Sequence, residues 1–397
     1  MKVLKIKDIV RTISITHKFD KDKLIAINTS DVENGIMHDG TLTAIEDLKG
    51  QFKKTVQKGD ILFSEIRPAN RRFALVTKDD CADYVVSTKL MVLRKYNNEV
   101  DLRYFYYCLT NQPFLDMLQR KAENRIGSFP QITFDLLSEY AFPVPSLSEQ
   151  EKIANIIFSL DHKIELNKQI NDKLEAMAKQ LYEYWFVQFD FPNEEGKPYK
   201  SSGGAMVWNE KLKREIPQGW NILPISDILD KYPTTKRYET KEYLQIGKYP
   251  IIDQGDAYIV GFTNENDNLL TRHPAVLFGD HSTKVKFLDF EFARGADGTQ
   301  ILYSSNDAVS QYYLYLVVSA LQIPNPGYSR HFKYLKELPI VIPSLSIATK
   351  FVNIVKPLFE KWTKNIFNNI ALTKQRDELL PLLMNGQASV NYHLSDD

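Results

Sequence analysis

The chain has 397 residues, with 50 basic and 50 acidic side chains and therefore no net charge. This length predicts at least two globular domains, and the charge balance argues against a nonspecific nucleic-acid coat while leaving room for local basic clefts. Two cysteines are too few for a disulfide framework or a zinc cluster, and no signal-peptide core or apolar run of about 18 residues is present, so we expect a protein of the reducing cytoplasm.

Residues 1–146 have the pattern of a mixed α/β domain. Short runs rich in apolar and β-branched side chains predict strands at Ile61–Phe63, Phe73–Val76 and Lys89–Leu93. Arg103–Met117 predicts a helix that packs through tyrosine and leucine side chains.

A long helix is predicted next, over residues 147–190. Ser148 is its expected N-cap, with Glu149 and Glu151 in the first turn. At ~1.5 Å per residue, the stretch Ser148–Phe189 would be about 60 Å long. Seam positions alternate in spacings of four and three residues, as in a coiled coil, and two of them are asparagine. The seam residues are Ile153, Ile157, Leu160, Ile164, Asn167, Asn171, Leu174 and Leu181.

Residues 191–215 predict a linker, because Pro, Gly, Ser and Lys cluster in Pro192–Gly204. A second α/β domain is predicted over residues 216–344. Its expected strands lie near Ala275–Phe278, Val285–Phe290 and Gln300–Tyr303, and its expected helix near Ser310–Leu321.

The second long helix, residues 345–386, repeats the first at an offset of 198 residues and is followed by a tail, residues 387–397. Pro343–Ser346 repeats the sequence PSLS of Pro145–Ser148, and Pro357 is expected to kink the helix. Because the asparagines recur at matched seam positions, we expect the two helices to pack together, antiparallel; the alternative is two ordinary core helices. The matching seam residues are Phe351, Val355, Leu358, Trp362, Asn365, Asn369, Leu372 and Leu379.

The duplication includes the domains as well as the helices. Leu4–Ile9 resembles Leu223–Ile228 at an offset of 219, whereas Leu137–Glu139 resembles Leu335–Glu337 at an offset of 198. The first domain is therefore longer by 21 residues internally. A period of this length indicates domain duplication rather than a solenoid of short repeats.

Three short motifs give weak evidence for catalysis. Asn325–Tyr328 (NPGY) departs from the Asn-Pro-Pro-Tyr motif that binds a target amino group, and no glycine-rich loop precedes it. Gly247-Lys248 lacks the rest of a phosphate loop, and Asp253 lacks the Glu-x-Lys of a nuclease. The seven histidines show no metal-ligand spacing. We therefore expect no catalytic residue, metal or cofactor in this chain.

Polar and basic side chains do gather after corresponding strands of the two domains. Arginine forks suit phosphates and guanine edges, and amides suit adenine, so these clusters are candidate DNA contacts; solvated loops are the alternative. In the first domain they are Arg67, Asn70, Arg71, Arg72, Lys89, Arg125 and Ser128. In the second they are Asp280, His281, Ser282, Lys284, Tyr328, Arg330 and His331.

Over essentially its whole length the chain resembles the specificity subunits of type I restriction-modification systems. The motifs that carry this resemblance are Gly59–Ser64, Ile66–Arg71, Val85–Thr88, Pro143–Ile153, Phe191–Pro192, Lys200–Gly204, Ile246–Pro250 and Arg376–Gly386. The fold it implies is α/β (α+β), with two duplicated target-recognition domains joined by two long helices in an antiparallel intramolecular coiled coil.

The resemblance also implies a function. Each domain would read one half of an asymmetric, split site on double-stranded DNA, while the helix pair would set the half-site spacing and dock two modification (methyltransferase) subunits. Restriction (translocase/nuclease) subunits would join through the complex. S-adenosylmethionine, ATP and Mg would bind in those partners. The second helix has Ile347–Thr349 where the first has Glu149–Glu151, so less symmetric docking is expected.

Two other hypotheses stay open. A duplicated coiled-coil adaptor would bind proteins at its globular ends without reading DNA. A stand-alone methyltransferase would bind a methyl donor by itself.

Overall fold

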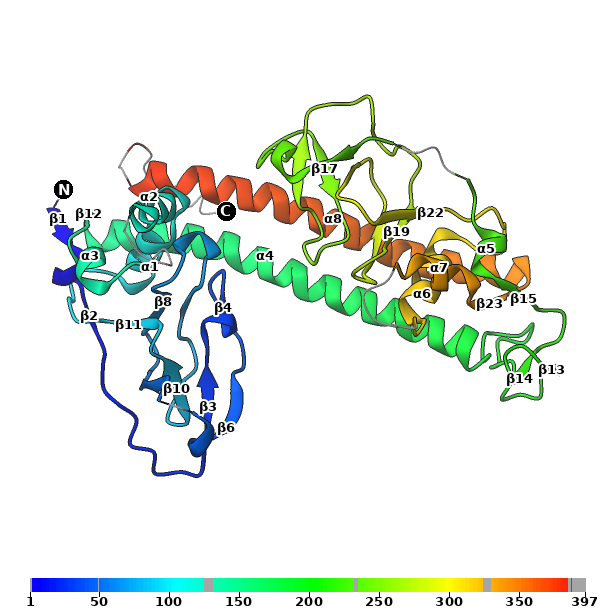
Figure 1. The fold of residues 1–397 in the computed structure, drawn as a ribbon, viewed down its shortest axis with the longest axis horizontal. Helices are drawn as coiled ribbons and strands as arrows, with labels where there is room; N and C mark the ends of the chain where they lie inside the picture. Colours follow the sequence, from blue (N-terminus) through cyan, green and yellow to red (C-terminus); the bar gives the residue numbers. More distant parts are fainter. Residues whose placement is uncertain are drawn as a thin grey trace, which may run out of the picture. The chain divides into compact units, whose positions relative to one another are not determined.

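The computed structural model describes residues 2–48, 50–124, 131–231, 235–323, 330–384 and 387. The chain divides into unit 1, formed by Met1–Glu165 with Asn369–Asp397, and unit 2, formed by Leu166–Asn368. Both units include part of each long helix, α4 (Leu147–Tyr182) and α8 (Leu345–Met384), which Figure 1 labels. The predicted fold class is confirmed: two mixed helix-and-sheet parts and a packed pair of long helices. The predicted domain boundaries stay predictions.

Unit 1 is built from short strands and short helices. Its strands are β1 (Lys2–Lys5), β2 (Val10–Thr12), β3 (Lys23–Ile27), β4 (Val32–Glu33), β5 (Ile36–Met37), β6 (Thr41–Ala44), β7 (Phe52–Lys54), β8 (Ile61–Ser64), β9 (Phe73–Leu75), β10 (Tyr84–Ser87), β11 (Leu90–Lys95) and β12 (Ala141–Val144). Its other helices are α1 (Leu102–Thr110), α2 (Gln112–Glu123) and α3 (Phe134–Ser138), with 3₁₀ turns at Ile6–Asp8, Thr29–Asp31, Ile45–Asp47 and Pro68–Asn70. The four-stranded sheets have the orders β2-β11-β8-β9 and β6-β3-β10-β7.

The strands predicted in the first domain are present as β8, β9 and β11, but the predicted helix Arg103–Met117 is two helices. Asn111 separates them, since its side chain accepts a hydrogen bond from Phe114 N at 2.9 Å and caps α2. Pro113 lies in the first turn of α2, where its missing N–H costs nothing. A capping residue followed by proline starts a new helix. The apolar pattern therefore runs across both helices although the helical backbone is interrupted between them.

The start of α4 corrects the predicted N-cap. Ser146, not Ser148, caps the helix: Ser146 Oγ accepts a hydrogen bond from Glu149 N at 3.4 Å, and Glu149 Oε2 accepts one from Ser146 N at 3.1 Å in return. The next residue, Gln150, is fully buried; its Nε2 donates to Glu99 O and Pro145 O, and its Oε1 accepts from Asp101 N. This side chain thus fixes α4 to the domain that precedes it.

Within unit 1, α4 and α8 run antiparallel. Arg376 Nη1 donates to Asp161 Oδ1 at 2.9 Å, and Asn369 Nδ2 donates to Ile164 O at 3.1 Å. One hydrophobic core joins Ile153 and Ile157 of α4, Leu380 of α8, and the aromatic side chains of α1. The helix ends are therefore part of the domain core rather than appended to it.

Unit 2 repeats this plan with different sheets. Its strands are β13 (Met206–Asn209), β14 (Arg214–Pro217), β15 (Asn221–Pro224), β16 (Arg237–Tyr238), β17 (Tyr249–Ile252), β18 (Gly261–Thr263), β19 (Ala275–Gly279), β20 (Val285–Leu288), β21 (Ala293–Gly295), β22 (Thr299–Leu302) and β23 (Pro339–Ile342). Its other helices are α5 (Ile225–Ile228), α6 (Gln311–Ala320) and α7 (Phe332–Glu337), with a 3₁₀ turn at Thr240–Glu242. The larger sheets have the orders β16-β21-β17-β18 and β20-β19-β22. The three strands and the helix predicted here are confirmed as β19, β20, β22 and α6.

The segment predicted as a linker, residues 191–215, lies within unit 2 and contains secondary structure. After α4 the helix widens into a π-helical turn, Glu183–Val187, which ends with Gln188 as its C-cap; the next residue, Phe189, has a φ of 66°. Phe191 stacks on Trp220 and on Tyr199, and β13 pairs with β14 in a hairpin. Aromatic side chains spaced among the Pro, Gly and Ser residues thus anchor a segment whose composition predicted a linker.

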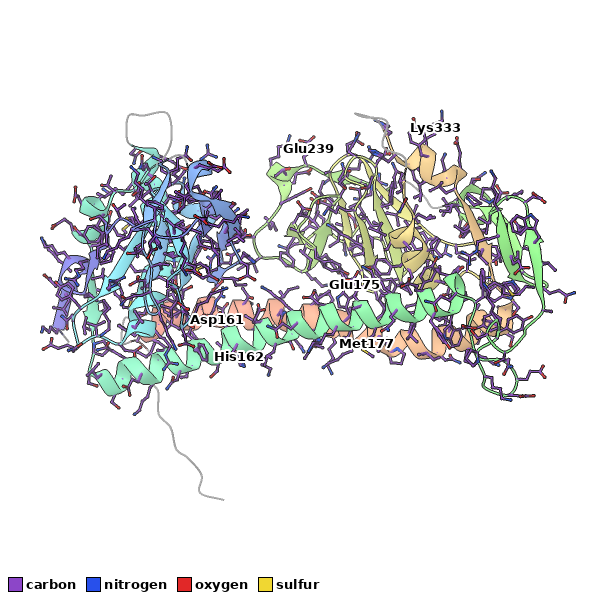
Figure 2. The ribbon with its side chains drawn as sticks, turned by 90° about the horizontal axis from the view of Figure 1, so that it is seen from below. Asp161, His162, Glu175, Met177, Glu239 and Lys333 are labelled. Carbon is purple, nitrogen blue, oxygen red and sulfur yellow. The ribbon has the colours of Figure 1, made fainter. Side chains whose placement is uncertain are left out.

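Within unit 2 the two helices are also antiparallel. Asn365 Nδ2 donates to Asn171 Oδ1 at 2.9 Å, and Asn171 Nδ2 donates to Trp362 O at 3.1 Å. Glu175 accepts a hydrogen bond from Tyr315 of α6 at 2.8 Å, whereas Met177 is exposed; Figure 2 shows these two side chains on opposite sides of α4. Every predicted seam residue of both helices is buried or half-buried. The helix α8 runs through Pro357 without ending.

The repeat predicted from the sequence reappears in the strand registers. In unit 1, Leu4 of β1 pairs with Phe142 of β12; in unit 2, Leu223 of β15 pairs with Ile340 of β23. The paired residues differ by the predicted offsets of 219 and 198. The two asparagine contacts to backbone, Asn171 to Trp362 and Asn369 to Ile164, are likewise related by 198 residues. The framework of the two halves is therefore duplicated residue for residue.

Candidate nucleic-acid interface

The loop between β8 and β9, residues 65–72, holds four of the predicted contacts in unit 1. A 3₁₀ turn, Pro68–Asn70, is flanked by Arg67 and Arg71, which both have positive φ values, 46° and 53°. Non-glycine residues in this conformation are strained, and such strain gathers at functional sites. Arg67 and Asn70 are exposed, so the turn presents one guanidinium and one amide to solvent.

The other two arginines of this loop make internal contacts. Arg71 donates through Nε to Asn34 Oδ1 at 2.8 Å and through Nη1 to Gln112 at 2.5 Å, and its guanidinium lies over the Phe73 ring. Burial lowers the pKa of Arg71, and the charge of Arg376 on α8 lowers it further. Arg72 bonds to Ser30 O and lies 3.5 Å from Glu33. These two side chains hold the loop in place.

Glu65 connects this loop to Lys89 and to the segment Gln131–Ile132. Its backbone N donates to Lys89 O at 3.0 Å, its carbonyl accepts from Ile132 N at 2.7 Å, and its carboxylate accepts from Gln131 Nε2 at 2.8 Å. Lys89 is exposed beside it. Arg125 and Ser128 lie outside the described residues.

The equivalent loop of unit 2, residues 280–284 between β19 and β20, is shorter. Phe63 and Phe73 are paired strand residues ten positions apart, whereas their counterparts Phe278 and Val285 are seven apart. Part of the 21-residue difference between the domains therefore lies in this hairpin loop, at a candidate contact surface.

Asp280 and His331 tie that hairpin to α7. Asp280 is 2% exposed and accepts a hydrogen bond from Phe332 N at 2.8 Å, while its carbonyl accepts from His331 N and lies 3.0 Å from His331 Nδ1. His331 is also buried. Both side chains therefore orient the hairpin loop relative to α7, and both are shielded from solvent.

His281, Ser282 and Lys284 surround the loop after β17. Gln254 accepts from His281 N at 2.9 Å through Oε1, and its carbonyl accepts from Ser282 Oγ at 2.6 Å. Lys284 lies 3.0 Å from Asp256. A side chain at Gly298 would meet Gln254 and His281, and this glycine has a φ of 80°. Three loops are thus packed so closely that only glycine fits between them.

The sequence reasoning missed an arginine cluster beside these loops. Arg237 of β16 and Arg294 of β21 are register partners in parallel strands, and Arg237 donates to Asp297, which also lies 3.9 Å from Arg330. No sequence motif marks the first two, since each lies in a strand of two or three residues. Tyr328 lies outside the described residues.

Among the described residues there is no group of three His, Cys, Asp or Glu side chains arranged to hold a metal ion. Within the same part of the chain, no helix is long and apolar enough to cross a membrane.

The family model and the similar proteins that match this chain all concern type I restriction specificity. The family model for the type I restriction modification DNA specificity domain matches residues 1–176 and again 217–372. The HindI specificity subunit of a type I restriction enzyme from Haemophilus influenzae is 30% identical, with 96% of this chain and 98% of that protein covered. The MjaIX specificity subunit from Methanocaldococcus jannaschii is 28% identical over 72% of this chain and 69% of that protein.

A solved structure shares the fold. The crystal structure of the S subunit of a type I restriction-modification system from M. genitalium aligns with a TM-score of 0.54 at 18% identity, covering 96% of both chains.

Proposed function

Because the chain belongs to the type I restriction modification DNA specificity family, whose model matches both of its halves, we propose that it selects the DNA sequence on which a type I restriction-modification complex acts. The chain is the specificity component and not a catalytic one. Each unit carries one specificity domain, so each would read one half of a split site. The loops that carry the candidate contacts differ in length and composition between the units, which favours two unlike half-sites.

The observation that carries this proposal is the pairing of a duplicated framework with unlike loops. The strand registers at the base of each domain and the asparagine contacts in the helix pair repeat at fixed offsets. A framework kept so closely, with its variation placed in the hairpin loops, is expected of two readers that share a scaffold and differ in target. Half-sites about one helical turn, ~34 Å, apart on DNA need a rigid spacer, which a paired coiled coil of long helices would supply.

We propose that the helices also dock the two modification subunits. In unit 2, α4 exposes large apolar side chains along one side, Leu166, Ile170 and Met177, which nothing in the described part of the chain covers. Their counterparts in α8, 198 residues later, are the polar Lys364, Asn368 and Gln375. The two docking surfaces would therefore differ. The methyl donor, ATP and Mg would bind in the modification and restriction subunits.

Methylome sequencing of a host that carries the system tests the proposal. An asymmetric motif of two half-sites separated by unspecified bases is the expected result. A selection of random duplexes by the complex of this chain with its modification subunit should enrich the same motif. If no motif is enriched while the complex still assembles, the chain is a protein adaptor and not a DNA reader. If the isolated chain binds S-adenosylmethionine, it is itself a methyltransferase.

A further inference from the structure

Arg294 in unit 2 has hydrogen-bond donors without acceptors. The residue is 8% exposed, and its Nε and Nη2 atoms are buried with no hydrogen-bond partner in the described part of the chain. Nε and Nη2 form the edge of the guanidinium that binds two oxygens side by side. A buried charge whose donors lack acceptors is costly, so its presence calls for an explanation outside the free protein.

The surroundings of Arg294 add positive charge rather than removing it. Arg237 is its register partner on the neighbouring parallel strand, so both side chains leave the same face of the sheet. Burial lowers the pKa of Arg294, and Arg237 lowers it further, while Asp297 acts in the opposite direction. Asp297 receives a hydrogen bond from Arg237 and lies 3.9 Å from Arg330. Asp297 is thus paired with Arg237 and lies near Arg330, and Nε and Nη2 of Arg294 stay without an acceptor among the described residues.

The loop that carries Asp297 belongs to the candidate interface. Asp297 O accepts a hydrogen bond from Gln254 Nε2 at 2.7 Å, and Gln254 contacts the hairpin loop 280–284 through His281 and Ser282. Figure 2 shows Glu239, two residues beyond Arg237, and Lys333, three residues beyond Arg330, on the side of unit 2 opposite to α4. Residues that follow Arg237 and Arg330 closely in sequence therefore lie on the side of unit 2 away from α4.

We propose that Arg294, with Arg237 and Arg330, binds a phosphate group of the DNA backbone next to the half-site read by unit 2. This inference rests on the proposed function and assigns a contact within it. A phosphate stands out from the duplex and can reach a recessed guanidinium. A base edge lies inside a groove, so a side chain must project from the protein surface to contact it, and the Arg294 side chain does not project. In the free protein Arg237 donates a hydrogen bond to the Asp297 carboxylate. When DNA binds, the phosphate replaces that carboxylate as the acceptor for Arg237.

The test uses the complex with the modification subunits and a duplex that contains the selected motif. Affinity is measured against salt concentration for the unaltered protein, for Arg294→Met and Arg237→Met, and for the control Lys211→Ala, which removes one exposed charge from the turn between β13 and β14. Loss of one phosphate contact should lower affinity on the order of tenfold and reduce the salt slope by about 1 in both arginine variants. The control should change neither quantity. Asp297→Asn should bind more tightly, because the competing carboxylate is gone.

Two further readouts separate a phosphate contact from other roles. Arg294→Met should keep or raise the melting temperature, because it removes a buried unpaired charge; a fall with an unchanged salt slope would show that Arg294 is structural and overturn the proposal. The methylated motif should stay the same in the arginine variants. Relaxation at one base pair would instead assign Arg294 to a base and overturn the phosphate assignment. If the unaltered complex selects no DNA motif, the proposed function fails first; if it does and the arginine variants bind normally, only the phosphate site fails.

Discussion

Asn365 Nδ2 donates a hydrogen bond to Asn171 Oδ1 at 2.9 Å across the seam between α4 and α8, and Asn365 is fully buried. The Oδ1 atom of Asn365 has no hydrogen-bond partner in the described part of the chain. The asparagine pair therefore lowers the stability of the protein, because one buried acceptor is unpaired, and it also specifies how the two helices align.

Removing one asparagine should harm the protein more than removing both. Asn365→Leu leaves Asn171 Oδ1 buried without a donor and should reduce the free energy of unfolding by about 1–3 kcal/mol in urea titrations. The double variant Asn171→Leu/Asn365→Leu should recover part of this loss but give a less uniform half-site spacing in the methylome. A double variant that is no more stable than Asn365→Leu alone would contradict this explanation.

Matched lengthening of the helices should change the spacing of the half-sites. One heptad inserted after Glu165 in α4 and another after Asn368 in α8 add about 10 Å to each helix at ~1.5 Å per residue. The methylated motif should then keep both half-sites and gain about three base pairs between them. An insertion in α4 alone should abolish assembly, because the asparagines no longer meet. Changed half-site sequences would show that the helices do not act as the ruler.

The ion pair between Asp60 and Arg94 should be essential to unit 1. Arg94 binds both carboxylate oxygens of Asp60, at 2.7 and 2.8 Å, and Asp60 is fully buried directly before β8. Asp60→Asn leaves a largely buried guanidinium without its counterion, so unfolding free energy should fall by about 3 kcal/mol. Lys58 and Asp79 form an exposed ion pair nearby, and Lys58→Ala should cost less than about 1 kcal/mol. Equal costs in the two variants would show that burial is not the cause.

Arg67 and Arg71 should behave differently although they flank the same turn. Arg67→Gly removes an exposed guanidinium and relieves a positive φ, so it should weaken DNA binding while raising stability by up to about 1 kcal/mol. Arg71→Ala should lower stability, because Asn34, Gln112 and Phe73 lose their contact. Affinity of the complex and thermal unfolding, measured together, check both. Unchanged affinity in Arg67→Gly would remove Arg67 from the interface.

Docking of a modification subunit should depend on the apolar side of α4. Ile170→Glu/Met177→Glu places charges where exposed apolar side chains would be covered by a partner, and native mass spectrometry should show the loss of one modification subunit. The matched control Asn368→Glu/Gln375→Glu alters the equivalent, already polar positions of α8 and should assemble normally. Loss of both subunits in both variants would contradict an unequal pair of docking surfaces.

Several features could be predicted because they depend on neighbouring residues. The strands β8, β19 and β22 and the helix α6 have strong apolar patterns, and the asparagine pairing follows from two copies of one seam. The N-cap was misplaced by two residues, since Ser146 and Ser148 are equally good caps and only the reach of Glu149 decides between them. The sheet β16-β21-β17-β18 was not predicted, because its strands have two to four residues and pair across long separations.

The duplication, the family and the pairing of the helices could all be inferred from the amino-acid sequence alone, because each depends on a pattern that occurs twice along the chain. Which polar residues are available to a ligand depends on contacts that form only when the chain folds. Asp280 and His331 belong to predicted clusters, yet both are buried and make internal contacts. Arg237 and Arg294 belong to no motif, yet they are register partners that place two positive charges side by side. Hydrogen-bond partners come from strands far apart in the chain, and no local pattern records which donors remain without acceptors.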